Sequence, residues 1–394
     1  MKNFVKAGFI VFLVFVQLPL QARIAYGTQG DMLSGARNTT YIADLLSYPL
    51  FIFSAKHTGG YGTYFFHAFV IIPIYSYFKT LQHEYFGHAY RARQYHRKND
   101  LIMKAPFPYN LFIEDNIAVA GYVKVTFDTL PTYDERLLLD AAGIEANNIA
   151  AKDYRIPMLK GKSLFYNYLI SRLSPFGYIL GDSGQISGGF EGDPSQYRLA
   201  LKQKYNDNNA LSVVSMRWQS LWYLLDPFLW TYVSDAMKPW PIGKELKFTF
   251  STNYYLSPYG PEFQLDFYLI KKKTIWIVTP RYGHGVKYIN GGLSVVGRNI
   301  IRVSQIGFGM DAHTWYQPKA NNGLAETTMS FGGGFALQAE WYFNPTYSLE
   351  AMLGYKTAGF LPGRSLDSET YFFIGLNMPF DLLGRDSRLD GGND

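Results

Sequence analysis

The pattern of hydrophobic and polar positions changes character near residue 240. Before that point, apolar residues come in long blocks of helical character, and no block is a clean run of 18 apolar residues. Helices of this kind fit a globular core, a membrane interface or a weak membrane span. The blocks are Tyr41–Ser54, Tyr64–His96, Tyr133–Asp153, Ser163–Leu180 and Leu211–Met237.

From Lys244 onward, apolar residues alternate with polar ones. Leu246, Phe248 and Phe250 open this pattern, which recurs after turn residues such as Asn290-Gly291-Gly292. Segments of about ten residues with one apolar and one polar face are typical of a transmembrane β-barrel. We expect roughly seven or eight strands, enough for the smallest closed barrel. A soluble antiparallel barrel or sandwich is the alternative.

The first 22 residues have the features of a secretory signal peptide. Lys2 and Lys6 give a positive start, Phe9–Val16 an apolar run, and Leu20-Gln21-Ala22 a small-residue cleavage site. The chain is therefore expected to be exported. We predict an α+β protein in four parts: a signal peptide (1–22), a helical metal-binding domain (23–240), the strands of an antiparallel β-barrel (241–381) and a polar tail (382–394).

Composition narrows the location and the partners. Aromatic residues make up 18% of the chain, with 32 Tyr and 30 Phe, as in proteins with an interfacial aromatic belt. The outer membrane is the expected site, and the periplasm is the alternative. The net charge of +6 comes without a polybasic block, which argues against nucleic-acid binding. The absence of cysteine excludes disulfides and thiolate ligands.

The candidate chemistry lies in the sequence His83-Glu84-Tyr85-Phe86-Gly87-His88. Zinc peptidases carry H-E-x-x-H, which places two imidazoles one helical turn apart with a glutamate beside the metal. Here the spacing is one residue longer, so a regular helix would separate His83 and His88 by about 140°. A π-bulge accommodates one inserted residue, and Gly87 would let the backbone unwind. Glu84 is the candidate general base.

A third metal ligand must come from elsewhere in the chain. We favour Glu145, a single acid within the small-residue stretch Ala141–Ala151, because burying a carboxylate is costly unless a cation meets it. Asp140 on the same segment would orient a metal ligand without binding the metal itself. Asp226, Asp182 and Asp193 are the less favoured alternatives.

Three motifs together resemble the site-2 protease family of zinc peptidases. His83–Ala89 is similar to its H-E-x-G-H-A with one insertion, Ala120–Val125 to its G-G-Y-V-K-M strand, and Asp140–Asn147 to its A-G-P-x-x-N element. The resemblance covers roughly residues 80 to 152. It implies His83 and His88 as ligands, Glu84 as base, and a substrate-facing role for Gly121 and Asn147. Glu145 instead resembles the helix-borne glutamate of the gluzincin peptidases.

Together these features predict a zinc-dependent metallopeptidase of the cell envelope, acting on a protein or peptide. Two alternatives remain open. One is a non-enzymatic outer-membrane barrel, a channel or scaffold with a helical plug, in which His83 and His88 are only polar positions on a basic helix end. The other is a metal-dependent hydrolase of an envelope lipid or cell-wall amide.

Overall fold

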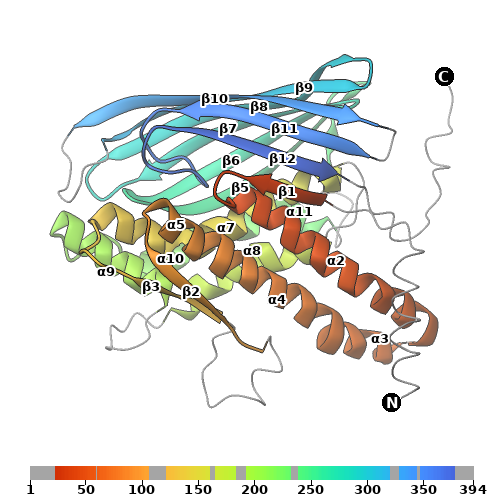
Figure 1. Ribbon diagram of the computed structural model, residues 1–394, viewed down its shortest axis with the longest axis horizontal. Coiled ribbons are helices and arrows are strands. Elements are labelled where there is room, and N and C mark those ends of the chain that lie inside the picture. The colour runs from red at the N-terminus through yellow and green to blue at the C-terminus, as the bar shows by residue number, and fades with distance from the viewer. Residues whose placement is uncertain are drawn as a thin grey trace.

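A layer of helices lies against one face of a large, curved antiparallel sheet (Figure 1). The computed structural model describes residues 23–58, 60–105, 121–159, 165–182, 192–231, 238–319, 328–343 and 347–377. The predicted signal peptide (1–22) and polar tail (382–394) lie outside these residues. Within them, helices and an antiparallel sheet confirm the α+β class.

The large sheet has ten strands in the order β1-β12-β11-β10-β9-β8-β7-β6-β5-β4. From β5 to β12, neighbours in the chain are neighbours in the sheet, as in a simple antiparallel meander. The bounds are β1 Arg23–Gly27, β4 Trp240–Pro241, β5 Leu246–Ser257, β6 Gly260–Lys271, β7 Thr274–His284, β8 Ile289–Val303, β9 Ile306–Pro318, β10 Met329–Tyr342, β11 Ser348–Lys356 and β12 Glu369–Asn377.

The prediction of a closed barrel needs correction. Among the described residues, β1 and β4 form the two ends of the strand order and do not pair with each other, so the sheet is open. It also has ten strands rather than the expected seven or eight, because the two-residue strand β4 adds to the series and β1, from the range predicted to be helical, pairs with β12. Five residues, Arg23–Gly27, are too short a run to show a period of two in the sequence.

Helices make up most of the chain before residue 231. Their bounds are α2 Met32–His57, α3 Tyr61–Phe66, η1 His67–Ile71, α4 Ile72–His83, η2 Glu84–His88, α5 Ala89–Gln94, α7 Tyr133–Leu159, α8 Phe165–Gly181, α9 Asp193–Tyr205, α10 Val213–Ser220, η3 Leu221–Leu225 and α11 Pro227–Trp230. A small second sheet pairs β2 Lys98–Met103 with β3 Gly121–Thr126. Across the described residues, no helix has both the length and the apolar character needed to cross a membrane.

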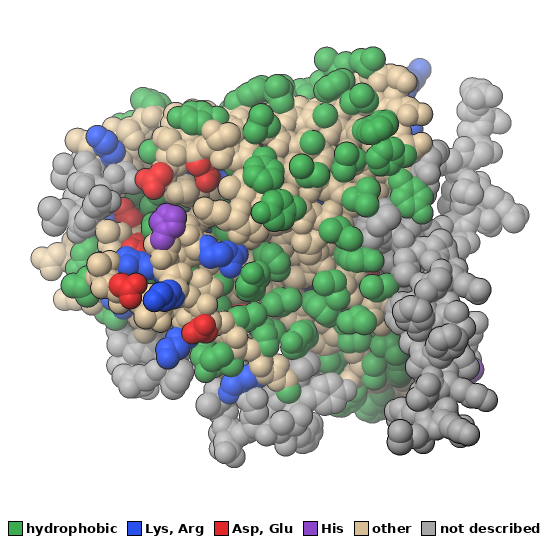
Figure 2. Space-filling model, viewed as in Figure 1, with side chains coloured by type: hydrophobic (Ala, Val, Ile, Leu, Met, Phe, Trp, Pro, Cys, Tyr) green, Lys and Arg blue, Asp and Glu red, His purple; other side chains and the backbone are tan. Residues whose placement is uncertain are grey.

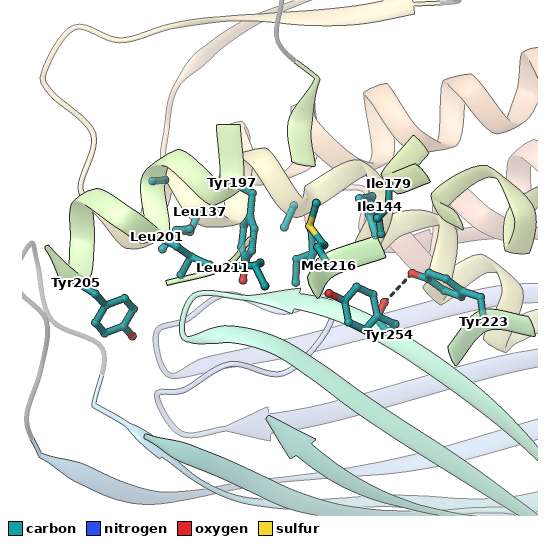
Figure 3. Close-up of a cluster of buried hydrophobic side chains, with 13 residues drawn as sticks. Leu137, Ile144, Ile179, Tyr197, Leu201, Tyr205, Leu211, Met216, Tyr223 and Tyr254 are labelled. Carbon is teal, nitrogen blue, oxygen red and sulfur yellow. Dashed lines mark hydrogen bonds between the residues drawn. The ribbon is translucent and has the colours of Figure 1, made fainter. Parts of the chain in front are cut away.

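The two layers meet in a buried cluster that centres on α7 and β5 (Figure 3). Leu137 and Ile144 of α7 pack there with side chains of α8, α9 and α10. The hydroxyl of Tyr223 donates to the carbonyl oxygen of Tyr254 at 2.7 Å, and the Asn148 side chain donates to the same oxygen at 2.8 Å. This packing fixes α7, which is the platform for the site described next.

Candidate functional site

The two histidines lie on one continuous helix that contains a π-turn. Residues Glu84–His88 form the π-helix η2 between α4 and α5, and the Ala89 N–H donates to the carbonyl oxygen of Glu84, five residues back. One turn therefore contains the inserted residue, and the predicted π-bulge is confirmed. The imidazole centroids of His83 and His88 are 5.1 Å apart, so both rings lie on the same side of the helix.

Small residues let this helix approach α7 closely. A side chain at Gly87 would begin 2.8 Å from the carbonyl oxygen of Ala142, closer than real contacts allow. A side chain at Gly143 would begin 2.1 Å from Nε2 of His83. Gly87 therefore serves close helix packing, and the imidazole of His83 lies directly over the α7 backbone at Gly143.

Asp193 completes the group. It is the first residue of α9, and its Oδ2 lies 2.9 Å from Nε2 of His88 and 3.3 Å from Nε2 of His83. Within the described residues, one ligand atom from each of the three side chains lies within 4.8 Å of the others. Asp193 was a less favoured alternative because the sequence does not show that the start of α9 packs against the histidine helix.

The hydrogen bonds of His88 restrict where its proton can be. Its Nδ1 lies 2.7 Å from the carbonyl oxygen of Leu139, which can only accept, so Nδ1 carries the proton. In neutral His88, Nε2 is then an acceptor facing the Asp193 carboxylate, another acceptor. Such a contact at 2.9 Å requires a second proton or a cation between the atoms. Without a cation, burial lowers the pKa of His88, but the charge and hydrogen bond of Asp193 outweigh burial and raise this pKa to about 10.

Asn147 determines in the same way which ring nitrogen of His83 carries the proton. Its Nδ2 lies 3.2 Å from Nδ1 of His83, while its buried Oδ1 has no hydrogen-bond partner. Rotating the amide by 180° exchanges these two atoms, and the choice between the two orientations follows from the hydrogen bonds that each can make. Oδ1 would then accept from Nδ1–H of His83, leaving Nε2 of His83 as an acceptor that faces Asp193.

The donor set fits a divalent metal. Two imidazole Nε2 atoms and one carboxylate oxygen converge, as in catalytic zinc sites with three protein ligands. Each imidazole has its other nitrogen at a fixed polar partner, Leu139 or Asn147, which is the usual support for a metal-bound histidine. Although burial raises it, the pKa of Asp193 is held far below its usual range by His88 and His83.

Glu84 and a cavity lie beside this group. Burial raises the pKa of Glu84, whose carboxylate also accepts a backbone hydrogen bond from Val123 of β3. The cavity has a volume of about 420 Å³ and lies between α4, α8 and β3. Its lining includes His83, Glu84, Gly121 and Tyr178. This volume is in the range of small-molecule binding sites.

Tyr178 of α8 is a site residue that sequence reasoning missed. Its ring packs edge-on against His83, with centroids 5.7 Å apart, and its hydroxyl accepts from the Asp193 N–H at 3.3 Å. The hydroxyl is therefore near both the candidate ligands and the cavity. With 32 tyrosines in the chain, no sequence signal distinguishes this one.

The structure does not bring Glu145 to the histidines, and its assignment as third ligand is corrected. Arg91 of α5 donates from Nη2 to Oε1 and Oε2 of Glu145 at 2.6 and 2.8 Å. Nε of Arg91 donates to Oε2 at 3.2 Å, and the Gly363 N–H adds a fourth hydrogen bond to the carboxylate at 2.7 Å. The argument that this buried carboxylate needs a cation was sound, but the cation is an arginine.

The other candidate acids have their own partners. Asp182 binds Arg198 at 3.1 Å, and Asp226 binds Arg155 at 2.9 Å and Arg172 at 3.2 Å. Asp140 differs, because its Oδ2 is buried without a hydrogen-bond partner. Burial and nearby Asp193 raise the pKa of Asp140 to about 8. Asp140 therefore interacts with Asp193 and His88 through its charge, and its Oδ2 makes no hydrogen bond that would orient a ligand as predicted.

Comparisons with known proteins add little to this geometry. No family model matches the chain, and no curated protein sequence matches it. A solved structure described as the NanC porin in a rhombohedral crystal form is similar at 14% identity and a TM-score of 0.27. The similarity covers 36% of this chain and 76% of the porin chain. A TM-score this low does not define a common fold, and we transfer nothing from it.

Proposed function

We propose that the protein is a zinc-dependent metallopeptidase in which His83, His88 and Asp193 hold the ion. One observation carries the proposal: Nε2 of His88, an acceptor when neutral, faces the carboxylate of Asp193 at 2.9 Å. The second histidine points its Nε2 at the same oxygen at 3.3 Å. A divalent cation satisfies all three groups at once, whereas without one His88 has to carry a second proton.

Each side chain has a role in hydrolysis that follows from its position. A divalent ion would lower the pKa of water at the site to about 7 and would polarise a carbonyl group. Glu84 takes the proton, because its carboxylate is buried beside His83 and its raised pKa suits a base that must also release a proton. Tyr178, whose hydroxyl is near the group, donates to the oxygen on which negative charge develops.

The neighbouring strand β3 favours a peptide as the substrate. Gly121 lines the cavity, and Val123 donates its N–H to Glu84, so the strand runs directly past the base. Among the described residues, β3 pairs with β2 on one side only. An extended peptide can add to a strand edge through main-chain hydrogen bonds. Asn147, which the family resemblance implied to face the substrate, lies instead against His83.

Elemental analysis and an activity assay test the proposal. We expect about one zinc ion per chain in the wild type and none in His83→Ala/His88→Ala. Casein-like substrates should be cleaved, and Glu84→Gln should keep the metal while losing hydrolysis. Cleavage of purified envelope lipids or cell-wall amides, but not of casein, would replace the peptidase assignment. Absence of metal from the wild type would support the alternative of a non-enzymatic channel or scaffold.

A further inference from the structure

The outer face of the ten-stranded sheet is apolar, and its inner face is polar. On β11, the exposed residues Leu353 and Tyr355 alternate with buried positions that include Glu350 and Lys356. On β10, exposed Leu337 adjoins buried Gln338. The outward positions of other strands are also apolar, among them Leu293 of β8, Phe308 of β9 and Ile374 of β12. This polarity is the reverse of that of a sheet whose outer face meets water.

The inner face carries paired charges. Lys152 of α7 binds Asp266 at 2.8 Å, and Arg37 of α2 binds Glu350 at 2.7 Å. Arg281 binds Glu262 at 2.8 Å beside a second cavity of about 180 Å³ between α7 and the sheet. In water, the hydrophobic effect favours turning apolar side chains inward and charges outward. A sheet that does the opposite over a broad area needs an apolar surrounding on its outside.

The apolar band has the height of a membrane core. On β10, outward aromatic residues stand at Phe331 and Trp341, ten positions apart, which is roughly 33 Å along a strand. At the usual strand tilt of about 40°, this corresponds to a band about 25 Å tall. Aromatic pairs mark both ends, Tyr316–Phe331 and Trp341–Phe343, each with centroids 4.6 Å apart. Strands β5 to β10 have 11 to 15 residues, enough to cross such a band.

One free edge of the sheet is covered in the way a lipid surrounding demands. Unpaired backbone groups in hydrocarbon each cost several kcal/mol. At the β1 edge, the side-chain amide of Asn38 in α2 donates to the carbonyl oxygen of Ala25 and accepts from its N–H, both at 2.8 Å. Asn38 therefore satisfies the edge-facing N–H and carbonyl group of Ala25 as a neighbouring strand would.

Charged side chains gather at one end of the molecule. Figure 2 shows lysine, arginine and acidic side chains where α5, β2 and α9 lie, whereas hydrophobic side chains spread over the rest of that face. Because η2 connects α4 to α5, the candidate metal site lies toward the charged end. A membrane that the strands cross at this tilt would leave that end in water.

We propose that the outer face of strands β5 to β12 contacts the hydrocarbon of a lipid bilayer and leaves the end formed by α5, β2 and α9 in water. The partner is the acyl-chain region itself rather than a headgroup or a second protein. The inference depends on the sheet alone, so it stands or falls independently of the metal site.

Single cysteines test this directly, because the chain has none of its own. A nitroxide spin label is attached to the full chain at Leu337→Cys, Leu353→Cys or Lys272→Cys. Each labelled protein is then reconstituted in dioleoylphosphatidylcholine vesicles. Lys272 lies in the exposed turn between β6 and β7 and is the water-facing control. Oxygen enters the bilayer interior, whereas a nickel chelate stays in water. Oxygen should therefore relax the labels at 337 and 353 far more than the chelate does, and the chelate should relax the label at 272 more than oxygen does.

Two results would overturn the proposal. If the nickel chelate reaches positions 337 and 353 as readily as 272, the face is in water. If neither reagent reaches 337 and 353, another protein surface, such as a second copy of the chain, covers them. Each labelled protein is first checked for the circular dichroism spectrum of the unlabelled chain, so that misfolded samples are discarded.

Discussion

Two charged clusters, one buried and one partly buried, adjoin the continuous helix α4–η2–α5 and differ in how their charges are satisfied. Arg91 and Glu145 join α5 to α7 through three side-chain hydrogen bonds, and both side chains are at most 1% exposed. One turn away, Nε2 of His88 and Nε2 of His83 both face the same oxygen of Asp193, at 2.9 and 3.3 Å. The first cluster is complete in itself, whereas the second is completed by a second proton on His88 or by a cation.

The difference separates a structural carboxylate from a functional one. Glu145 and Asp193 both face positive or potentially positive partners, so the charge of the partners alone does not distinguish them. What distinguishes them is the balance of donors and acceptors around each. Arginine has donors for every oxygen of Glu145, whereas the nitrogens around Asp193 have protons committed to Leu139 and, once its amide is turned, Asn147.

The largest effect that this comparison predicts is on the chemistry at Glu84. Glu84→Gln keeps the size and burial of the side chain but removes the base. Hydrolysis should fall about 10²- to 10⁴-fold, the usual contribution of general-base catalysis, while the metal content stays unchanged. Initial rates on a peptide substrate measure this. Full activity in Glu84→Gln would remove Glu84 from the mechanism.

A substitution in the cluster of Arg91 and Glu145 should change the free energy of unfolding rather than metal binding. Glu145→Gln leaves Arg91 as a buried charge without its counter-charge, which costs about 3–5 kcal/mol of unfolding free energy. The matched control is Glu245→Gln, which breaks an exposed pair with Lys272 and should cost less than about 1 kcal/mol. Urea unfolding measures both. Similar values for the two variants would contradict the structural role of Glu145.

The packing of His83 over α7 gives a third test. Gly143→Ala places a methyl group 2.1 Å from the present position of Nε2 of His83, so the imidazole has to move. We expect about 1–3 kcal/mol of destabilisation, together with weakened metal binding. Gly177→Ala on α8 is the control, because a methyl group there has no atom within 4 Å. Equal metal affinity in both variants would show that the position of His83 is not critical.

The smallest effect should come from the support behind His83. Asn147→Ala removes the side chain that fixes the imidazole tautomer, and such changes weaken metal binding about 10- to 100-fold. Isothermal titration with zinc gives this ratio. Wild-type affinity in Asn147→Ala would place the amide outside the metal site.

The sequence predicts the local features of this protein better than its long-range ones. The inserted residue between His83 and His88 indicated a π-turn, because a regular helix cannot bring both rings to one side, and η2 has that turn. Alternation after Lys244 likewise located the strands. These features depend on residues close together in the chain, where spacing determines geometry.

The third ligand and the sheet edge could not be found in this way. Asp193 lies 105 residues from His88 in the chain, and no spacing rule connects them. The prediction of Glu145 as the third ligand was wrong. Its small neighbours indicated a tight helix contact, which the structure contains, but the contact is made by Gly87 and Gly143. Strand β1 joins β12 across the whole length of the chain, so its pairing depends on the completed sheet.

Metal content in Asp193→Asn and Glu145→Gln tests the central claim most directly. Each substitution removes one carboxylate charge, and circular dichroism confirms that each variant is folded before elemental analysis. We predict about one zinc ion per chain in the wild type and in Glu145→Gln, and a loss of zinc in Asp193→Asn. Zinc retained in Asp193→Asn but lost in Glu145→Gln would contradict the assignment of the two clusters.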